Sequence, residues 1–372
     1  MSGTIFENGA IVTGNGRTAD RLCVHGERIV ADAPPGAARI DLDGGWLLPG
    51  FIDTQVNGGG GALFNDDPSV EAIRRIGAAH ARFGTTAFLP TLISDTLDRV
   101  DRAMRATEQA IAEGVPGVVG IHIEGPFLNP ARKGTHDAAR FRRLDRDAIA
   151  LLASLERGRT LVTLAPERCA PEDIAALVAA GVIVAAGHSD ADYATMRGAF
   201  EAGVTGVTHL FNAMSPLHHR APGVVGAAIE NQSAYVGLIV DGHHVAPAAL
   251  RIALAARPHD RFMLVTDAMS PVGTDATSFE LQGKTIRIED GVCMEENGTL
   301  AGSALDMARA VRNAVTMLGL EVADAAGMAS ASPAAFLGLN DRGTLRPGAR
   351  ADLVWLDAEL MPRGTWIGGA LV

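Results

Sequence analysis

Four strand-like apolar stretches of this sequence each end on a residue that can bind a metal ion or move a proton. The four residues are Glu124, His188, His209 and Asp267, and they follow runs such as VIVAAG and RFMLVT. One carboxylate and two imidazoles leave a coordination position open for water, which is typical of catalytic zinc and similar divalent metals. Asp267 could then take a proton from the attacking water and return it to a leaving amine. The set predicts a hydrolytic metal site.

Each of these residues also has a simpler interpretation when it is taken alone. A single histidine at a strand end is more often a hydrogen-bonded structural residue, and Asp267 could cap the loop AMSPVG that follows it. Three candidate ligands at the ends of separate strands favour a shared metal, because a barrel brings the carboxyl ends of its strands to one face. The apolar residues FMLV before Asp267 favour an inward, partly desolvated carboxylate.

The segments that must position these residues alternate between apolar runs and helix-compatible stretches. Runs that are apolar along their whole length indicate strands buried on both faces, as in parallel sheets. Eight such runs with helical spacing between them predict an α/β fold, a (β/α)8 TIM-type barrel. A doubly wound sheet is the alternative, but no GxGxxG follows the first run and the candidate residues fall on many strands. The runs span residues 51–57, 86–93, 117–125, 160–166, 182–188, 206–211, 235–242 and 262–268.

The two ends of the chain differ from the middle. Residues 5–47 consist of short alternating runs broken by glycine and Asn-Gly turns, which is typical of small β-structures. The C-terminal segments GTLRPGARADLVWLDAEL and GTWIGGALV share this pattern. We therefore expect a small β-sandwich domain built from residues 1–47 and 341–372, beside a hydrolase barrel of residues 48–340. A helix over 304–318 is expected to pack outside the barrel.

Composition limits the partners and the compartment. Of the 372 residues, 47% are hydrophobic and 20% charged, as in a globular protein with a substantial core. A net charge of −11 argues against nucleic acid as a partner, and the lysines, Lys133 and Lys284, form no polybasic membrane patch. Three distant cysteines fit a reducing compartment, and neither a signal peptide nor a membrane-spanning run is recognised. A soluble cytoplasmic protein is expected, with no nucleic-acid or membrane partner.

Loops that follow the strands carry candidate substrate-binding residues. His136 could polarise a carbonyl group or bind a hydroxyl. Arg220 and His244, with the backbone N–H groups of Asn212 and Ala213, could form an anion pocket, because arginine suits bidentate recognition of phosphate. The glycine-rich stretch GTLAGSALDM would allow the backbone to approach a ligand closely. Outside this pattern, each of these residues would be interpreted as a solvated loop residue.

Taken together, the motifs resemble those of the N-acetylglucosamine-6-phosphate deacetylases, a family within the amidohydrolase superfamily. They span nearly the whole predicted barrel in the family's order, and GTLRPGARADLVWLD resembles the superfamily's β-domain return. The resemblance implies metal-dependent hydrolysis of the acetamide of N-acetylglucosamine 6-phosphate, which gives glucosamine 6-phosphate and acetate for amino-sugar catabolism or cell-wall recycling. The similar segments are PGFIDTQVNGGGG, HIEGPFLNPARKGTHD, AAGHSDADY, VTHLFNAMSPLHHRAPGVVG, VDGHHV, LVTDAMSPVG and GTLAGSALDM.

The resemblance also assigns roles to individual residues. Glu124, His188 and His209 correspond to the metal ligands, and Asp267 corresponds to the catalytic acid/base. It further implies a homodimer, in which Arg220 or His244 acts on the substrate phosphate across the subunit interface. The corresponding substrate-binding positions are Thr135, His136, Asn212, Ala213, Arg220, His244, Leu300, Ala301 and Gly302.

Two departures from the wider superfamily concern the metal. Many members have His-x-His at the end of the first strand and a carboxylated lysine after the fourth. This chain has Gln55 and Asn57 at the first place and the lysine-free segment APERC at the second. Neutral amides are poor ligands for transition metals. We therefore expect one divalent ion per subunit, zinc before iron, cobalt or manganese, with His122 beside the ligands rather than among them.

Two rival functions stay open at the level of the sequence. Another amidohydrolase, such as an aminoacylase, would not need the phosphate site that Arg220 and His244 suggest. A catalytically silent phosphosugar-binding protein would have no use for Asp267 as a base. Acceptance of N-acetylgalactosamine 6-phosphate is not decided by the sequence.

Overall fold

The computed structural model describes residues 3–14, 17–289 and 291–372. Parallel strands form a nearly closed barrel, and hydrogen bonds connect them in the order β15-β14-β13-β12-β11-β10-β9-β6. An isolated parallel bridge between Val56 and Ala268 links the two ends of this series. The predicted TIM-type barrel is therefore confirmed. Its strands are β6 (Phe51–Val56), β9 (Thr85–Ile93), β10 (Gly120–Glu124), β11 (Arg159–Leu164), β12 (Ile183–Ala186), β13 (Gly206–Val207), β14 (Tyr235–Leu238) and β15 (Phe262–Leu264).

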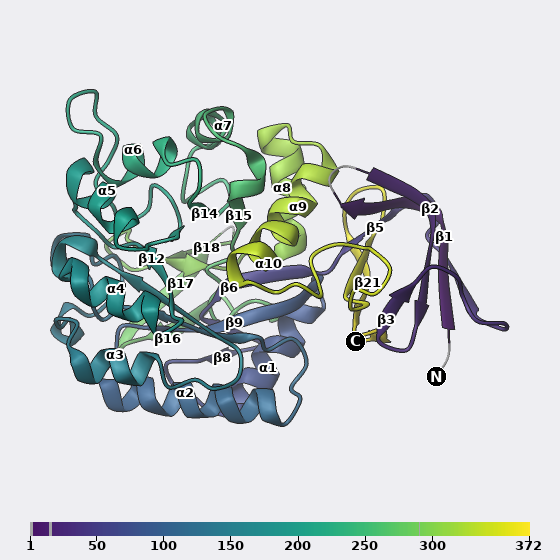
Figure 1. Cartoon of the computed structure of the whole chain (residues 1–372), viewed down its shortest axis with the longest axis horizontal. Coiled ribbons are helices and arrows are strands. Elements are labelled where there is room, and N and C mark those ends of the chain that lie inside the picture. The colour runs from purple at the N-terminus through teal and green to yellow at the C-terminus, as the bar shows by residue number, and fades with distance from the viewer. Residues whose placement is uncertain (1–2, 15–16, 290) are drawn as a thin grey trace.

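Helices alternate with these strands and cover the outside of the barrel (Figure 1). Their starting points follow from local sequence, because Ser69, Thr96, Asp145 and Asp192 each accept a hydrogen bond from a backbone N–H of the first turn. Among the described helices, none is long and apolar enough to cross a membrane. The helices are α1 (Val70–Ala81), α2 (Leu97–Ala112), α3 (Arg146–Leu152), α4 (Pro171–Ala179), α5 (Tyr193–Glu201), α6 (Gly223–Glu230), α7 (Pro247–Ala255), α8 (Met307–Leu318), α9 (Val322–Ala329) and α10 (Ala331–Leu337).

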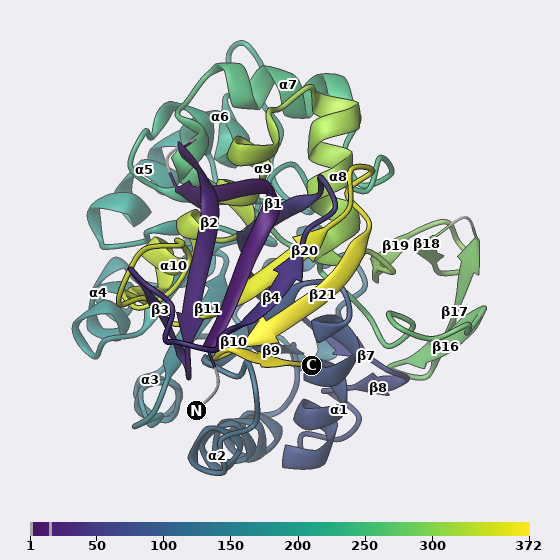
Figure 2. The ribbon, with the colours of Figure 1, turned by 90° about the vertical axis from the view of Figure 1, so that its right-hand side faces the viewer.

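The two ends of the chain pair with each other in a second sheet beside the barrel, as Figures 1 and 2 show. Strand β5 joins them, because it runs parallel to β1 and antiparallel to β20. Phe6 and Trp366, from opposite ends of the chain, meet edge to face at 4.9 Å. All eight strands belong to one hydrogen-bonded sheet. They are β1 (Gly3–Gly14), β2 (Arg17–His25), β3 (Arg28–Val30), β4 (Ala38–Asp41), β5 (Trp46–Pro49), β20 (Leu353–Leu356), β21 (Pro362–Ile367) and β22 (Ala370–Leu371).

An antiparallel sheet that the sequence pattern did not indicate is inserted between β15 and α8. Its strands are β16 (Ser278–Leu281), β17 (Lys284–Glu289), β18 (Val292–Met294) and β19 (Leu300–Ser303), and it projects to one side of the molecule (Figure 2). The stretch GTLAGSALDM, predicted as a loop, is thus partly strand. A further short hairpin, β7 (Gly58–Gly59) with β8 (Ala62–Leu63), follows β6. Both features lie on the side of the barrel where the parallel strands end.

Candidate active site

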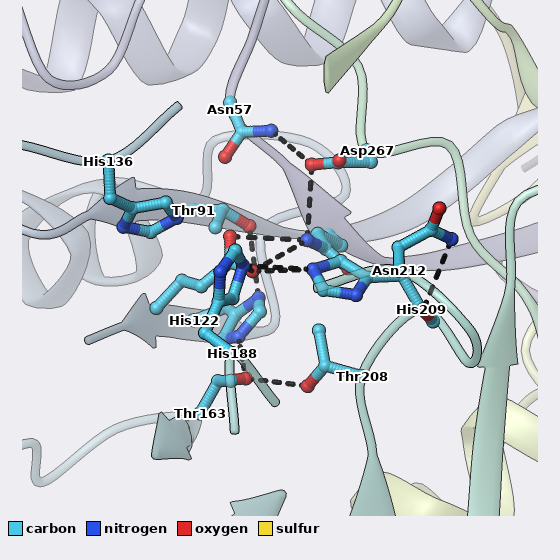
Figure 3. Close-up of polar contacts among 12 residues, drawn as sticks. Asn57, Thr91, His122, His136, Thr163, His188, Thr208, His209, Asn212 and Asp267 are labelled. Atoms are coloured by element: carbon cyan, nitrogen blue, oxygen red, sulfur yellow. Dashed lines mark hydrogen bonds and ion pairs between the residues drawn. The ribbon is translucent and has the colours of Figure 1, made fainter. Parts of the chain in front are cut away.

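Three buried side chains converge at the carboxyl ends of neighbouring strands. Glu124 is the last residue of β10, and His188 and His209 follow β12 and β13 by two residues each. Oε1 of Glu124 lies 3.1 Å from Nε2 of His188 and 3.0 Å from Nε2 of His209, and the two nitrogens are 3.2 Å apart (Figure 3). These are separations expected of ligands that share one small ion, since zinc–nitrogen and zinc–oxygen bonds are about 2.0–2.2 Å long.

The hydrogen bond that His188 makes with the backbone suits a cation in this cluster. Its Nδ1–H donates to the carbonyl oxygen of Arg132 at 2.8 Å, so Nε2 of the neutral ring carries a lone pair. That lone pair faces the Glu124 carboxylate and the nitrogen of His209. This lone pair and the Glu124 carboxylate, 3.1 Å apart, repel one another unless a proton or a metal ion lies between them, and a divalent ion would meet all three groups at once. The three residues are also the group of the described chain whose ligand atoms lie within 4.8 Å of one another.

The backbone at these positions is held in an unusual conformation. His188, His209 and Asp267 have φ values of 49°, 30° and 51°, in the left-handed region that residues with a Cβ seldom adopt. Such strain costs of the order of 1 kcal/mol or more per residue and clusters at functional sites. Three of the four residues singled out from the sequence share it. Positive φ also occurs at Asn8, Asp43 and Leu360 outside the barrel, so the strain supports a functional site here only together with the side-chain chemistry.

Asp267 lies beside the cluster and is fixed by amide donors (Figure 3). Its Oδ1 accepts hydrogen bonds from Nε2 of Gln55 at 3.1 Å and from Nδ2 of Asn57 at 2.7 Å. The same Gln55 nitrogen is 3.2 Å from both oxygens of Glu124, so one amide bridges the two carboxylates. Burial, followed by repulsion from Glu124, raises the pKa of Asp267 to about 6. Its Oδ2 receives no hydrogen bond from any residue that the structure describes.

His122 lies next to the cluster but turns its ring nitrogens elsewhere. Nε2 is 2.8 Å from the hydroxyl of Thr163, and Nδ1 is 3.4 Å from that of Thr91. Thr163 in turn contacts Thr208 at 2.7 Å. These polar groups fill the barrel interior below the three candidate ligands (Figure 3). The arrangement agrees with the expectation that His122 supports the site without being a ligand.

A cavity of about 350 Å³ opens directly above the cluster. His136 is buried in its wall, and Nδ1 accepts hydrogen bonds from the backbone N–H of Ser94 at 3.3 Å and from its hydroxyl at 2.8 Å. The proton of the neutral ring is therefore on Nε2, which can donate to a ligand. Burial, with a smaller effect of His188, lowers the pKa of His136 to about 3. Of the residues predicted from the sequence, those that line the cavity are Glu124, Thr135, His136, His188, His209, Asn212, Ala213, His244, Asp267, Leu300 and Gly302.

Two predicted substrate-binding residues are not in this lining. Arg220 is exposed on the loop before α6, and Ala301 is buried in β19 with no face on the cavity. Thr135 lines the cavity, but its hydroxyl donates to Oε1 of Glu295 at 3.0 Å. His244 also lines the cavity and donates from Nδ1 to Asp241 at 2.6 Å, so its Nε2 is not used in that contact.

The sequence pattern did not indicate four residues that shape the site. Ser94 orients His136, the carbonyl of Arg132 orients His188, and Gln282 and Glu295 reach the site from the inserted sheet. Ser94 directly follows β9, so its position at a strand end was the one available signal. Nothing near Gln282 or Glu295 in the sequence indicates contact with residues more than a hundred positions away.

A parallel barrel whose strand ends present Glu, two His and a buried Asp to one cavity is typical of the class of metal-dependent barrel hydrolases. The chain belongs to the Amidohydrolase family, whose sequence model matches residues 46–372. It is 43% identical to the N-acetylgalactosamine-6-phosphate deacetylase of Shewanella sp. (strain ANA-3) over 371 residues, which cover 100% of this chain and 93% of the relative. It is 35% identical to the N-acetylglucosamine-6-phosphate deacetylase of Haemophilus influenzae over 357 residues, covering 94% and 93%.

Solved structures agree with these relatives. The N-acetylglucosamine-6-phosphate deacetylase of Pasteurella multocida superposes with a TM-score of 0.95 at 34% identity, covering 100% of this chain and 99% of that one. A mutant of the Mycobacterium smegmatis enzyme, in complex with N-acetyl-D-glucosamine-6-phosphate, gives a TM-score of 0.93 at 35% identity with the same coverage. The family resemblance derived from the sequence motifs is confirmed.

Proposed function

We propose that this protein hydrolyses the acetamide of N-acetylglucosamine 6-phosphate to glucosamine 6-phosphate and acetate. The observation that carries the proposal is the convergence of Glu124, His188 and His209 beside Asp267 and His136 on one cavity. The names of the relatives and the phosphosugar bound in one similar structure support the substrate. A silent phosphosugar-binding protein would gain nothing from the buried Asp267.

Glu124, His188 and His209 are proposed to hold one divalent ion per subunit, with zinc as the first candidate. When bound, such an ion would act as a Lewis acid and lower the pKa of a water molecule. Asp267 Oδ2, which accepts no hydrogen bond from the described residues, takes a proton from the attacking water as the water oxygen bonds to the acetyl carbon. His136 donates from Nε2–H to the carbonyl oxygen as negative charge develops on it. Asp267 then passes the proton to the sugar nitrogen, the C–N bond breaks, and acetate and the free amine are released.

Recognition of the phosphate is proposed to require a second subunit. The arginine that lines the cavity, Arg132, is 2.8 Å from Asp190 and so is already paired. His244 lines the cavity, whereas Arg220 is exposed and does not line the cavity of its own subunit. A homodimer in which Arg220 reaches the neighbouring cavity would supply the missing positive charge.

Active-site complementation tests this arrangement. Arg220→Ala and Asp267→Asn chains are each expected to be poorly active alone. Mixed dimers would contain one intact site, so a one-to-one mixture should recover about a quarter of wild-type activity. No recovery after subunit exchange would show that Arg220 does not act across the interface.

The substrate itself is tested by acetate release from protein of known metal content. We expect strong preference for N-acetylglucosamine 6-phosphate over unphosphorylated N-acetylglucosamine. Equal or reversed preference would retain the hydrolase but eliminate the phosphate site, and an aminoacylase-like activity would then be favoured.

A second candidate substrate is N-acetylgalactosamine 6-phosphate, the 4-epimer. It is favoured by the names of two relatives, at 43% and 37% identity. Comparison of kcat/KM for the two epimers, measured in competition, decides between them.

Compartment and domain division are also proposals. The described cysteines are all free, which agrees with a cytoplasmic setting, and the negative net charge agrees with the lack of a nucleic-acid partner. We propose that residues 1–47 and 341–372 form one domain and residues 48–340 the hydrolase barrel. Limited proteolysis with cleavage concentrated near residue 341 would support this division, whereas Leu47 is buried in β5 and should be protected.

A further inference from the structure

The inserted sheet touches the loop after β10 on both sides of His136. Glu295, in the β18–β19 turn, accepts the hydroxyl of Thr135 at 3.0 Å. Gln282, at the β16–β17 turn, accepts the backbone N–H of Asp137 at 3.0 Å. Residues 135 and 137 flank His136 in the chain, so the sheet holds the two neighbours of this histidine.

Gln282 also reaches the residue that orients the ring of His136. Its Nε2 donates to the carbonyl oxygen of Ser94 at 3.3 Å. The N–H and hydroxyl of the same Ser94 meet Nδ1 of His136 at 3.3 and 2.8 Å. One side chain therefore connects the backbone beside His136 with the residue that fixes its tautomer.

Glutamine is not the residue type that the turn at position 282 would favour. Leu281 pairs with Lys284, so Gln282 and Gly283 form a two-residue hairpin turn in which both have positive φ, 50° and 78°. Asparagine or aspartate is preferred at such a position, because its short side chain tolerates left-handed backbone. The glutamine is longer by one methylene, which gives it the reach for its two contacts.

We infer that Gln282 is a positioning residue that holds His136 in place to donate its Nε2 proton to the substrate carbonyl. The inference rests on the proposed function, since it assumes the role of His136 given above. It extends the active site to the inserted sheet. The geometry needed for transition-state stabilisation is narrow, so loosening this connection should act mainly on kcat.

The test uses Gln282→Asn, because asparagine suits the turn but cannot make both contacts. We expect an unchanged or slightly higher Tm, a kcat about tenfold lower, and a KM within about twofold of wild type. Thr285→Ala is the matched control, since it removes an exposed contact to Glu280 at 2.7 Å in the same hairpin. It should leave both kinetic constants unchanged. A Gln282→Asn enzyme with wild-type kcat overturns the inference.

The same substitution in a His136→Ala background shows whether Gln282 acts through His136. We expect no further loss of kcat there, because the group being positioned is gone. An equal fold-loss in both backgrounds would mean that Gln282 acts independently, which also overturns the inference.

A readout without turnover separates this inference from the proposed substrate. In ¹H–¹⁵N spectra, the His136 ring should be a single Nε2–H tautomer in the wild type and a mixture of tautomers in Gln282→Asn. If the mixture of tautomers appears in Gln282→Asn but the wild type does not deacetylate N-acetylglucosamine 6-phosphate, the positioning role is retained and the proposed substrate is rejected. A single tautomer in both proteins would reject the positioning role.

Discussion

At the scale of single residues, the candidate metal site is defined by the hydrogen bond that orients His188 and by the short distances among the three ligand atoms. Nδ1–H of His188 donates to the Arg132 carbonyl, and its Nε2 lies 3.1 Å from Oε1 of Glu124 and 3.2 Å from Nε2 of His209. His188, His209 and Asp267 also share positive φ values, a conformation that residues with a Cβ seldom adopt. Both features are explained if the cluster is built to bind a cation.

Replacing one candidate ligand should therefore abolish metal binding. The metal content is expected to be about one divalent ion per chain in the wild type and nearly zero in His188→Ala, which should also lose hydrolysis. His122→Gln is the control, because His122 bonds to Thr163 and Thr91 rather than to the cluster. Elemental analysis after dialysis checks both. Metal retained by His188→Ala, or lost by His122→Gln, would contradict the assignment of ligands.

At this scale, the sequence indicated the position of a side chain where the signal was local. Glu124, His188, His209 and Asp267 each end an apolar run, and a buried parallel strand gives such a run for a simple physical reason. Glu295 could not be found in this way, since its partner Thr135 is 160 positions away. Arg220 was predicted in the anion pocket from its guanidinium chemistry and from the family resemblance, and it does not line the cavity of its own subunit.

At the scale of elements, the hairpin after β6 depends on a buried histidine of α1. His80 donates from Nε2 to the carbonyl oxygen of Gly58 at 2.9 Å, and its Nδ1 is buried without a partner among the described residues. Burial lowers the pKa of His80 to about 4. Between pH 6.5 and 4 the unfolded chain takes up a proton that the folded chain excludes, so stability falls as pH falls through this range.

Removal of this group should flatten the acid dependence of stability. Between pH 7 and pH 5, the free energy of unfolding of the metal-free protein should fall in both wild type and the His80→Gln variant. The fall should be about 2 kcal/mol smaller in the variant. Urea titrations at the two pH values measure it, and His25→Gln, at an exposed histidine, is the control. An unchanged dependence in His80→Gln would show that His80 is not the group responsible.

Helix α2 allows a test of whether its N-terminal cap residue contributes to stability. The hydroxyl of Thr96 accepts the backbone N–H of Arg99 at 3.3 Å and caps the helix. Thr96→Ala should lower the free energy of unfolding by about 1 kcal/mol, and Thr96→Asp should retain the wild-type value. If both variants lose the same amount in chemical denaturation, the cap is not what Thr96 contributes.

The elements also show why part of the fold could not be predicted. The barrel strands are apolar throughout and gave a clear pattern, whereas β16 and β17 are mostly exposed, with one fully buried residue each over four and six positions. Such short, charged strands, separated by tight turns, resemble loop sequence. Their pairing is decided by contacts with the barrel mouth, which a single sequence does not reveal.

At the scale of the whole molecule, head and tail are tied through β5 and β20. Leu353 is fully buried between β5 and β21, while Leu371 at the sheet edge is 66% exposed. Leu353→Ala should cost about 3 kcal/mol of stability, and Leu371→Ala close to nothing. Thermal unfolding compares them. Equal effects would mean that the head–tail sheet does not contribute to global stability.

The most direct test of the proposed hydrolysis compares wild type with Asp267→Asn at equal metal content. Both products, acetate and glucosamine 6-phosphate, are measured from N-acetylglucosamine 6-phosphate in one reaction. We predict stoichiometric release by the wild type and a kcat lower by roughly 10²–10⁴-fold in the variant, because the group that moves the proton is absent. A variant that keeps its metal and nearly normal kcat would contradict the role of Asp267, and with it the proposed chemistry of the site.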